Sequence, residues 1–175
     1  MRRYWTVLLA LAFLAAPASA DEWQAVTAPG LGFSALFPVK PHFSEELADL
    51  GDGQKAKTST HQIIATNTIY DVTVAEYPKG MLAPIGEEQV LDNARDGAVA
   101  NAPGPLLGET KMEFAGRPAR EFKVDMSMNL VATNRIFVVG DRLYSVGAVT
   151  NKDRTNSPDI AKFFASFKLE GASKP

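Results

Sequence analysis

Alternating apolar and polar residues predict three strands in the first half of the chain. Side chains alternate across a strand, and in the segment 33–37 Phe33, Ala35 and Phe37 share one face. The segments 57–66 and 69–77 are rich in threonine, isoleucine, valine and tyrosine, which favour strands, and a short turn separates them. Two glycines and an aspartate predict another turn at 50–54.

Three more strands are expected in the second half of the chain, at 117–126, 129–139 and 142–150. Gly140 and Asp141 separate the last two of these strands. A two-residue link with glycine favours a hairpin, because glycine readily adopts the positive φ that such turns need. A hairpin at this point places Phe137 opposite Tyr144, an aromatic pair that fixes the register.

A helix is predicted over 87–101. Glu87 and Glu88 lie in its first turn, where free backbone N–H groups favour carboxylates. Pro103 and the glycine after it mark its end. One stripe of this helix consists largely of small side chains, so we expect it to lie close to the surface that it covers. The stripe comprises Val90, Leu91, Ala94, Ala98 and Asn101.

A second helix is predicted near the C-terminus, with Ser157 as its N-cap and Pro158 at its first position. Its apolar residues recur at i, i+3, i+4 and i+7, which is one face of a helix: Ile160, Phe163, Phe164 and Phe167. A helix on a membrane surface would have a polar face rich in lysine and arginine, whereas this one has two lysines and an aspartate. Burying each large side chain contributes about 1.5–3 kcal/mol, so we assign this face to the core rather than to a partner.

The order of these elements predicts an α+β fold. Strands, one helix, antiparallel strands and a terminal helix fit a single antiparallel sheet covered by helices, an α/β/α sandwich. We expect one domain over residues 21–175, because a domain of about 150 residues buries roughly 68–70% of its unfolded surface.

The first 20 residues have the pattern of a secretory signal peptide. Two arginines precede an apolar run that is shorter than the ~20 residues of a membrane span, and Ala18-Ser19-Ala20 offers a cleavage site after Ala20. The sequence therefore predicts a periplasmic or secreted protein. Removing the two arginines leaves 16 basic and 20 acidic residues, a net charge of −4, which disfavours nucleic acid as a partner. The sequence has no cysteine, so disulfides and thiol chemistry are excluded.

Few residues suggest catalysis or metal binding. His42, with Glu45 and Glu46 nearby, matches no paired-histidine metal motif, and His61 falls in a predicted strand. No serine lies in a G-x-S-x-G elbow, and no glycine-rich phosphate loop is present. We therefore expect no enzyme activity, no metal and no cofactor.

Four arginines on the last three predicted strands are the candidate binding residues: Arg117, Arg120, Arg135 and Arg142. Arg120 shares a strand face with Phe122 and Val124, so its guanidinium should lie at the rim of the buried surface. An arginine in such a place pairs with a carboxylate of its own chain or holds a carboxylate or phosphate from outside. The sequence leaves both alternatives open.

Several segments together resemble the Mog1/PsbP-like fold of small exported bacterial proteins. They are GFSALFPVKP at 32–41, GRPAREF at 116–122, RIFVVGDRLYSVGAV at 135–149 and FFASFKL at 163–169. The resemblance implies an antiparallel sheet between helices. The relatives for which the fold is named are accessory proteins, one of a small GTPase and the other of the oxygen-evolving photosystem. No motif transfers a binding residue, since a fold alone does not determine function.

Three functions follow as hypotheses. The first is a non-enzymatic periplasmic accessory protein that binds a partner. The second is a carrier of a small apolar or anionic ligand between helix and sheet, and the third is a hydrolase with an unrecognised site at Glu45 or His42. The sequence specifies neither the partner nor the oligomeric state.

Overall fold

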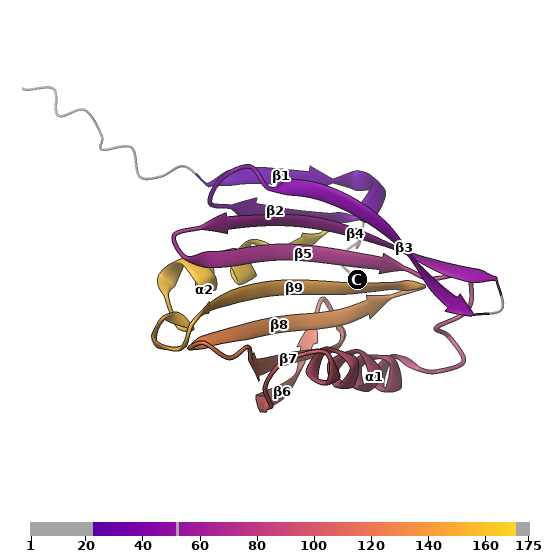
Figure 1. Cartoon of the computed structure of the whole chain (residues 1–175). Coiled ribbons are helices and arrows are strands. Elements are labelled where there is room, and N and C mark those ends of the chain that lie inside the picture. The colour runs from indigo at the N-terminus through magenta and orange to yellow at the C-terminus, as the bar shows by residue number, and fades with distance from the viewer. Residues whose placement is uncertain (1–22, 52, 171–175) are drawn as a thin grey trace, which may run out of the picture.

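The computed structural model describes residues 23–51 and 53–170. The predicted signal peptide, residues 1–20, lies outside these residues. Within them the chain forms two antiparallel sheets and two α-helices (Figure 1). The strands are β1 (Gln24–Ala28), β2 (Phe33–Phe37), β3 (His42–Gly51), β4 (Gln54–Ala65), β5 (Thr68–Glu76), β6 (Leu106–Phe114), β7 (Arg117–Asp125), β8 (Leu130–Val139), β9 (Arg142–Asn151) and β10 (Lys168–Leu169). The helices are α1 (Glu87–Ala100) and α2 (Pro158–Ser166), and short 3-10 turns span Pro29–Leu31 and Lys152–Arg154.

The larger sheet has seven strands in the order β3-β4-β5-β9-β8-β7-β6, and the smaller sheet has the order β1-β2-β10. The hairpin predicted at Gly140 is confirmed: Phe137 lies opposite Tyr144, and their stacked rings have centroids 5.1 Å apart. Strands β5 and β9 join the two halves of the larger sheet, since β5 pairs with β9 and not with the next strand in sequence.

The predicted fold class, a single antiparallel sheet covered by helices, is wrong. One face of the larger sheet is covered by the smaller sheet together with α2, and α1 covers only part of the opposite face. The protein is therefore mainly β, with two helices among its described residues. The prediction failed because it included neither the edge strands β3 and β6 nor the short strands β1 and β10, which pair with β2 to make the second sheet.

The main core lies between the two sheets. The four apolar residues predicted for the terminal helix face, Ile160, Phe163, Phe164 and Phe167, are all buried there, which confirms their assignment to the core. The N-cap is also as predicted, because the Ser157 hydroxyl accepts the Ile160 N–H at 3.4 Å. After α2 the chain pairs with β2 as β10, so the segment that follows Phe167 is fixed to the smaller sheet.

A second, smaller core lies beneath α1. Val90 and Leu91 pack on residues of β7 and β8, among them Phe122 and Ile136. Ala98, which the sequence placed on the inward stripe, is exposed. Figure 1 shows α1 in front of the β6–β8 end of the sheet, while β4 and β5 carry no helix on this side. Part of the larger sheet thus keeps one open face. No helix in the described part of the chain is long and apolar enough to span a bilayer.

Candidate interaction surface

Strand β3 forms an edge of the larger sheet and is exposed along its whole length. All ten of its residues are exposed, and β4 is the one strand that pairs with it among the described residues. Its outer edge therefore presents backbone N–H and C=O groups without a strand partner, which is a ready template for another strand.

Three large apolar side chains of β3 face solvent. Phe43 is 47% exposed, Leu47 is 65% exposed and Leu50 is 39% exposed. Register places Phe43 opposite His61 on the sheet face that carries the smaller sheet. The centroid of the His61 ring lies 4.8 Å from the centroid of Phe43 and 5.4 Å from that of Phe33. Phe43 therefore extends the aromatic packing of the core out to the edge. Burial lowers the pKa of His61, which favours the neutral ring.

The charges of β3 are all acidic. Glu45 accepts hydrogen bonds from Lys57 at 2.8 Å and Ser59 at 3.1 Å, and the bond from Lys57 chiefly lowers its pKa. Glu46 and Asp49 form no ion pair within residues 23–51 and 53–170. The edge therefore combines exposed apolar side chains with unpaired negative charge.

β3 has only some of the devices that usually protect an edge strand. Natural edges are blunted by short strands, by charged side chains and especially lysine, by proline, or by bulges that twist the edge away, and on β3 the charged side chains are three carboxylates. β3 is ten residues long with neither lysine nor proline, and its irregularity, between Asp49 and Gly51, lies at the end. The sequence pattern predicted no strand at these residues. The available signal was the turn at 50–54, since a strand directly after a turn favours a partner strand directly before it.

The four candidate arginines lie in three different places, and each pairs with a carboxylate of its own chain. Arg117 pairs with Glu87 at 3.0 Å, Arg135 with Glu121 at 2.7 Å and Arg142 with Glu76 at 2.7 Å. The Arg135 guanidinium also lies over the Phe164 ring, 5.1 Å from its centroid. Each of these contacts is a pair within the chain, one of the two alternatives that the sequence left open. Binding of an anion from outside stays a prediction.

Arg120 is fully buried rather than at the rim of the buried surface. It donates hydrogen bonds to Glu88 and Asp92 of α1, the latter at 3.2 Å, and its Nε lies 3.1 Å from Glu109 Oε1 without hydrogen-bond alignment. Burial alone lowers the pKa of Arg120, but the bonds to Glu88 and Asp92 outweigh this effect and raise it. Arg120 therefore joins α1 and β6 to β7, which is a structural role.

Arg117 and Arg142 do line one common cleft, of about 470 Å³, at an end of the space between the sheets. The Tyr144 hydroxyl at its wall donates to the Leu31 carbonyl at 2.9 Å. Three carboxylates line the same cleft, from Glu76, Asp141 and Glu170, so its side chains total two positive against three negative charges. This balance does not favour an anionic ligand.

The histidines and glutamates considered for catalysis do not converge. His42 and Glu46 lie on one face of β3 but four residues apart, which is about 13 Å along a strand, and Glu45 points to the other face. Among the described residues no group of three or more His, Asp or Glu side chains is placed to hold a metal ion.

Comparison with known proteins identifies the fold. No protein-family profile matches the sequence, and no curated protein matches it. The structure is similar to the solution structure of cyanobacterial PsbP (CyanoP) from Synechocystis sp. PCC 6803, with a TM-score of 0.52. The match covers 89% of this chain and 98% of that chain at 13% sequence identity. The predicted PsbP-like fold is confirmed, and at this identity the likeness concerns the fold alone.

Proposed function

We propose that this protein is a non-enzymatic accessory protein of the bacterial periplasm, and that it binds a partner protein by adding a strand of that partner to β3. The observation that carries the proposal is the ten-residue edge, exposed throughout and paired on one side. Strand addition draws its affinity from main-chain hydrogen bonds and its specificity from the side chains on either face. The signal-peptide pattern at 1–20 supports the periplasmic location.

The chemistry of β3 indicates what kind of strand it takes. Phe43 and Leu47 favour apolar residues on one face of the added strand. Glu46 on the other face, and Asp49 next to Leu47, favour lysine or arginine. A second copy of β3 is a poor occupant, because the acidic residues of two copies would share one ladder. Like charges opposite each other on a sheet are destabilising. We therefore expect an extended segment of a different protein, with apolar and basic residues.

Site-specific photo-crosslinking in intact cells tests this proposal. A photoreactive residue replaces Leu47 on β3 in one variant and Leu107, which is 50% exposed on the opposite edge strand β6, in a matched control. We expect position 47 to crosslink to one protein, through a segment that carries apolar and basic residues, and position 107 to give no such product. Equal products from both positions, or none from position 47, would contradict the proposal.

A charge reversal provides the second arm of the experiment. Glu46→Lys combined with Asp49→Lys should abolish the crosslink from position 47 while the protein remains folded, because both side chains are exposed. Slower amide hydrogen exchange in β3 on addition of the purified partner would establish strand pairing. Fractionation of the same cells tests the location: the protein should be released with the periplasmic contents.

A further inference from the structure

The open face of the larger sheet carries two neighbouring rows of polar side chains. Register places one row across β3, β4, β5, β9 and β8, and it consists of His42, Gln62, Asp71, Gly147 and Asn134. The next row crosses β3, β4, β5 and β9, and it consists of Ser44, Thr60, Thr73 and Ser145. Within the second row the Thr60 and Thr73 hydroxyls are hydrogen-bonded at 3.1 Å. The face therefore offers hydroxyl and amide groups at strand spacing, about 4.8 Å apart.

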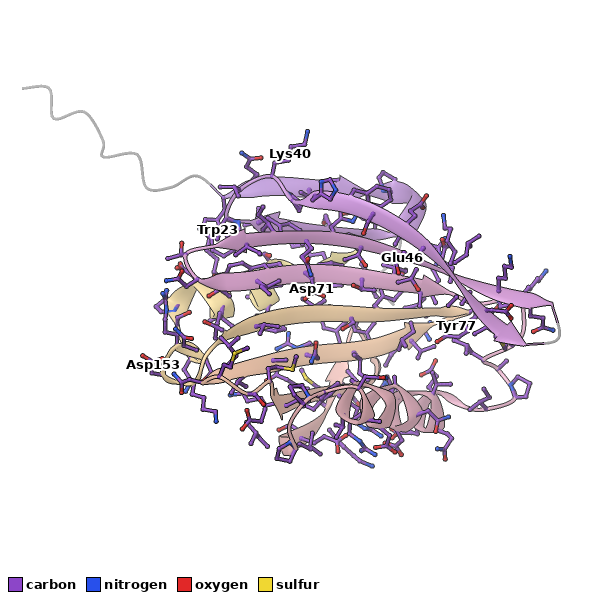
Figure 2. The ribbon with its side chains drawn as sticks, viewed as in Figure 1. Trp23, Lys40, Glu46, Asp71, Tyr77 and Asp153 are labelled. Carbon is purple, nitrogen blue, oxygen red and sulfur yellow. The ribbon has the colours of Figure 1, made fainter. Side chains whose placement is uncertain are left out.

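Asp71 lies at the centre of this face (Figure 2). It is half-buried, and its carboxylate takes part in no ion pair within the described part of the chain. Its one side-chain partner there is the Thr73 hydroxyl, at a long 3.5 Å. Most other buried or half-buried carboxylates of the sheet have an arginine or lysine, as Glu121 has Arg135.

Gly147 provides the space that the Asp71 carboxylate occupies. A Cβ at position 147 would lie 2.5 Å from Asp71 Oδ1, closer than any real contact, so only glycine allows the carboxylate to lie across β9. Burial also raises the pKa of Asp71 to about 6, which means that its ionised form destabilises the fold. A carboxylate that is held at such a cost without a cation is a candidate binding group.

The composition of the two rows points to an uncharged ligand with many hydroxyl groups. A carboxylate accepts hydrogen bonds from hydroxyls, and the amides of Gln62 and Asn134 both donate and accept them. A cationic ligand would meet a single carboxylate among uncharged groups, and an anionic ligand would meet Asp71 unfavourably. Gln62 and Asp71 are one strand apart and Asn134 is two strands beyond Asp71, so the row spans roughly 14 Å, enough for more than one sugar ring.

We infer that this face binds a carbohydrate chain, with Asp71 as its central hydrogen-bond acceptor and Gln62 and Asn134 on either side. This site lies on the open sheet face and does not depend on the proposed partner strand at β3. It gives the protein a second surface for recognition, directed at a glycan rather than at a protein.

Titration of the isotope-labelled protein with chitohexaose, cellohexaose and maltohexaose, observed by NMR, tests this inference. We expect at least one of the three to shift the side-chain amide signals of Gln62 and Asn134, with a Kd of about 1 mM or tighter. Asp71→Asn keeps the shape of the side chain but removes its charge and one acceptor. This variant should bind on the order of tenfold more weakly, because a hydrogen bond to a charged group is stronger than one to a neutral group.

The matched control is Glu113→Gln, which removes an exposed carboxylate from β6 and should bind like the original protein. Gly147→Ala displaces the Asp71 carboxylate without removing it, and should also weaken binding. If this variant does not fold, the titration of Asp71→Asn alone tests the inference. The inference is overturned if no oligosaccharide moves the two amide signals, if shifts are confined to β3, or if Asp71→Asn binds as tightly. Asp49→Lys, on the opposite face of β3, should leave the titration unchanged, which separates this site from the strand-addition site.

Discussion

Replacing Asp71 with asparagine should stabilise the protein at neutral pH and have little effect in acid. Burial raises the pKa of Asp71 from its ordinary 3.8 to about 6, so the folded state holds the proton more tightly than the unfolded state. Well below pH 4 the carboxyl is protonated in both states and its charge has no effect. As the pH rises from about 4 to about 6, the unfolded state ionises first and stability falls. Above about pH 6 the loss is complete.

The size of the effect follows from the same two pKa values. Each pKa unit corresponds to about 1.4 kcal/mol, so moving from 3.8 to about 6 limits the destabilisation to roughly 3 kcal/mol. Asp71 is half-buried and keeps some access to water, which reduces this figure. We therefore expect Asp71→Asn to raise the free energy of unfolding by about 1–3 kcal/mol at pH 7 and by under about 0.5 kcal/mol at pH 4. The asparagine fits, because Gly147 leaves the same space for it.

Urea unfolding of both proteins at pH 4, 5, 6 and 7 measures this difference. The gap between the two free energies of unfolding should open between about pH 4 and pH 6 and then stay constant. Glu113→Gln on β6 is the control, since an exposed carboxylate should give no comparable gap. A gap of the same size at every pH, or a variant less stable at pH 7, would show that burial does not raise the pKa of Asp71.

Three further predictions concern stability and are measured by urea unfolding at pH 7. Phe163→Ala should lower the free energy of unfolding by about 3–5 kcal/mol, because the ring is fully buried. Phe43 is half exposed, so Phe43→Ala should lower it by under about 1 kcal/mol. Equal losses would contradict the assignment of Phe163 to the core. Arg120→Met should destabilise by about 3 kcal/mol because it leaves the carboxylates of α1 without their buried cation. Arg117→Met, at an exposed pair, should change stability by under about 1 kcal/mol, and a reversed ranking would refute the role given to Arg120. Gly104→Ala should destabilise by about 1–3 kcal/mol, because a Cβ there would lie 2.6 Å from a backbone oxygen of β7; an unchanged midpoint would mean that the loop shifts freely.

Elements that bury one face were predictable from the sequence. In α2 the core accepts side chains on one side of the helix, and this imposes the spacing of Ile160, Phe163, Phe164 and Phe167. The same reasoning holds for the β8–β9 hairpin, where the Phe137–Tyr144 pair was placed correctly. In both cases the burial of one face requires apolar residues at regular intervals, and this interval is visible in the sequence.

The edge strands lack such a period. In β3 the apolar residues Phe43, Leu47 and Leu50 recur at intervals of four and three, which is the period of a helix, because no buried face demands alternation. β6 is also largely exposed and was missed for the same reason. Two strands of the second sheet were missed for related reasons. β1 has no buried residue and therefore no alternation, unlike β2, which has the same length, and β10 contains two residues, too few for a pattern.

The residue types of the candidate site were visible in the sequence, but their surroundings were not. Arg120 was correctly placed on the face of Phe122, yet its carboxylate partners lie about 30 positions earlier on α1, and no local pattern joins them. Asp71 falls in the strand predicted over 69–77, and no local pattern distinguishes it from any other polar residue of a strand. Its relation to Gly147 arises from the pairing of β5 with β9, which are far apart in the sequence.

The packing of the core also limits where this protein is able to bind anything. A carrier that holds its ligand between helix and sheet needs an empty interior, but here the rings of Phe163 and Phe167 fill the space beneath the smaller sheet. The centroid of the Phe163 ring lies 5.2 Å from those of both Phe37 and Tyr70, and the centroid of Phe167 lies 5.6 Å from that of Phe33. An interior packed in this way admits a ligand only if the core is rebuilt. The acidic apolar edge of β3 and the polar open face around Asp71 lie outside this packed core, so both surfaces are accessible for recognition without any change in the core.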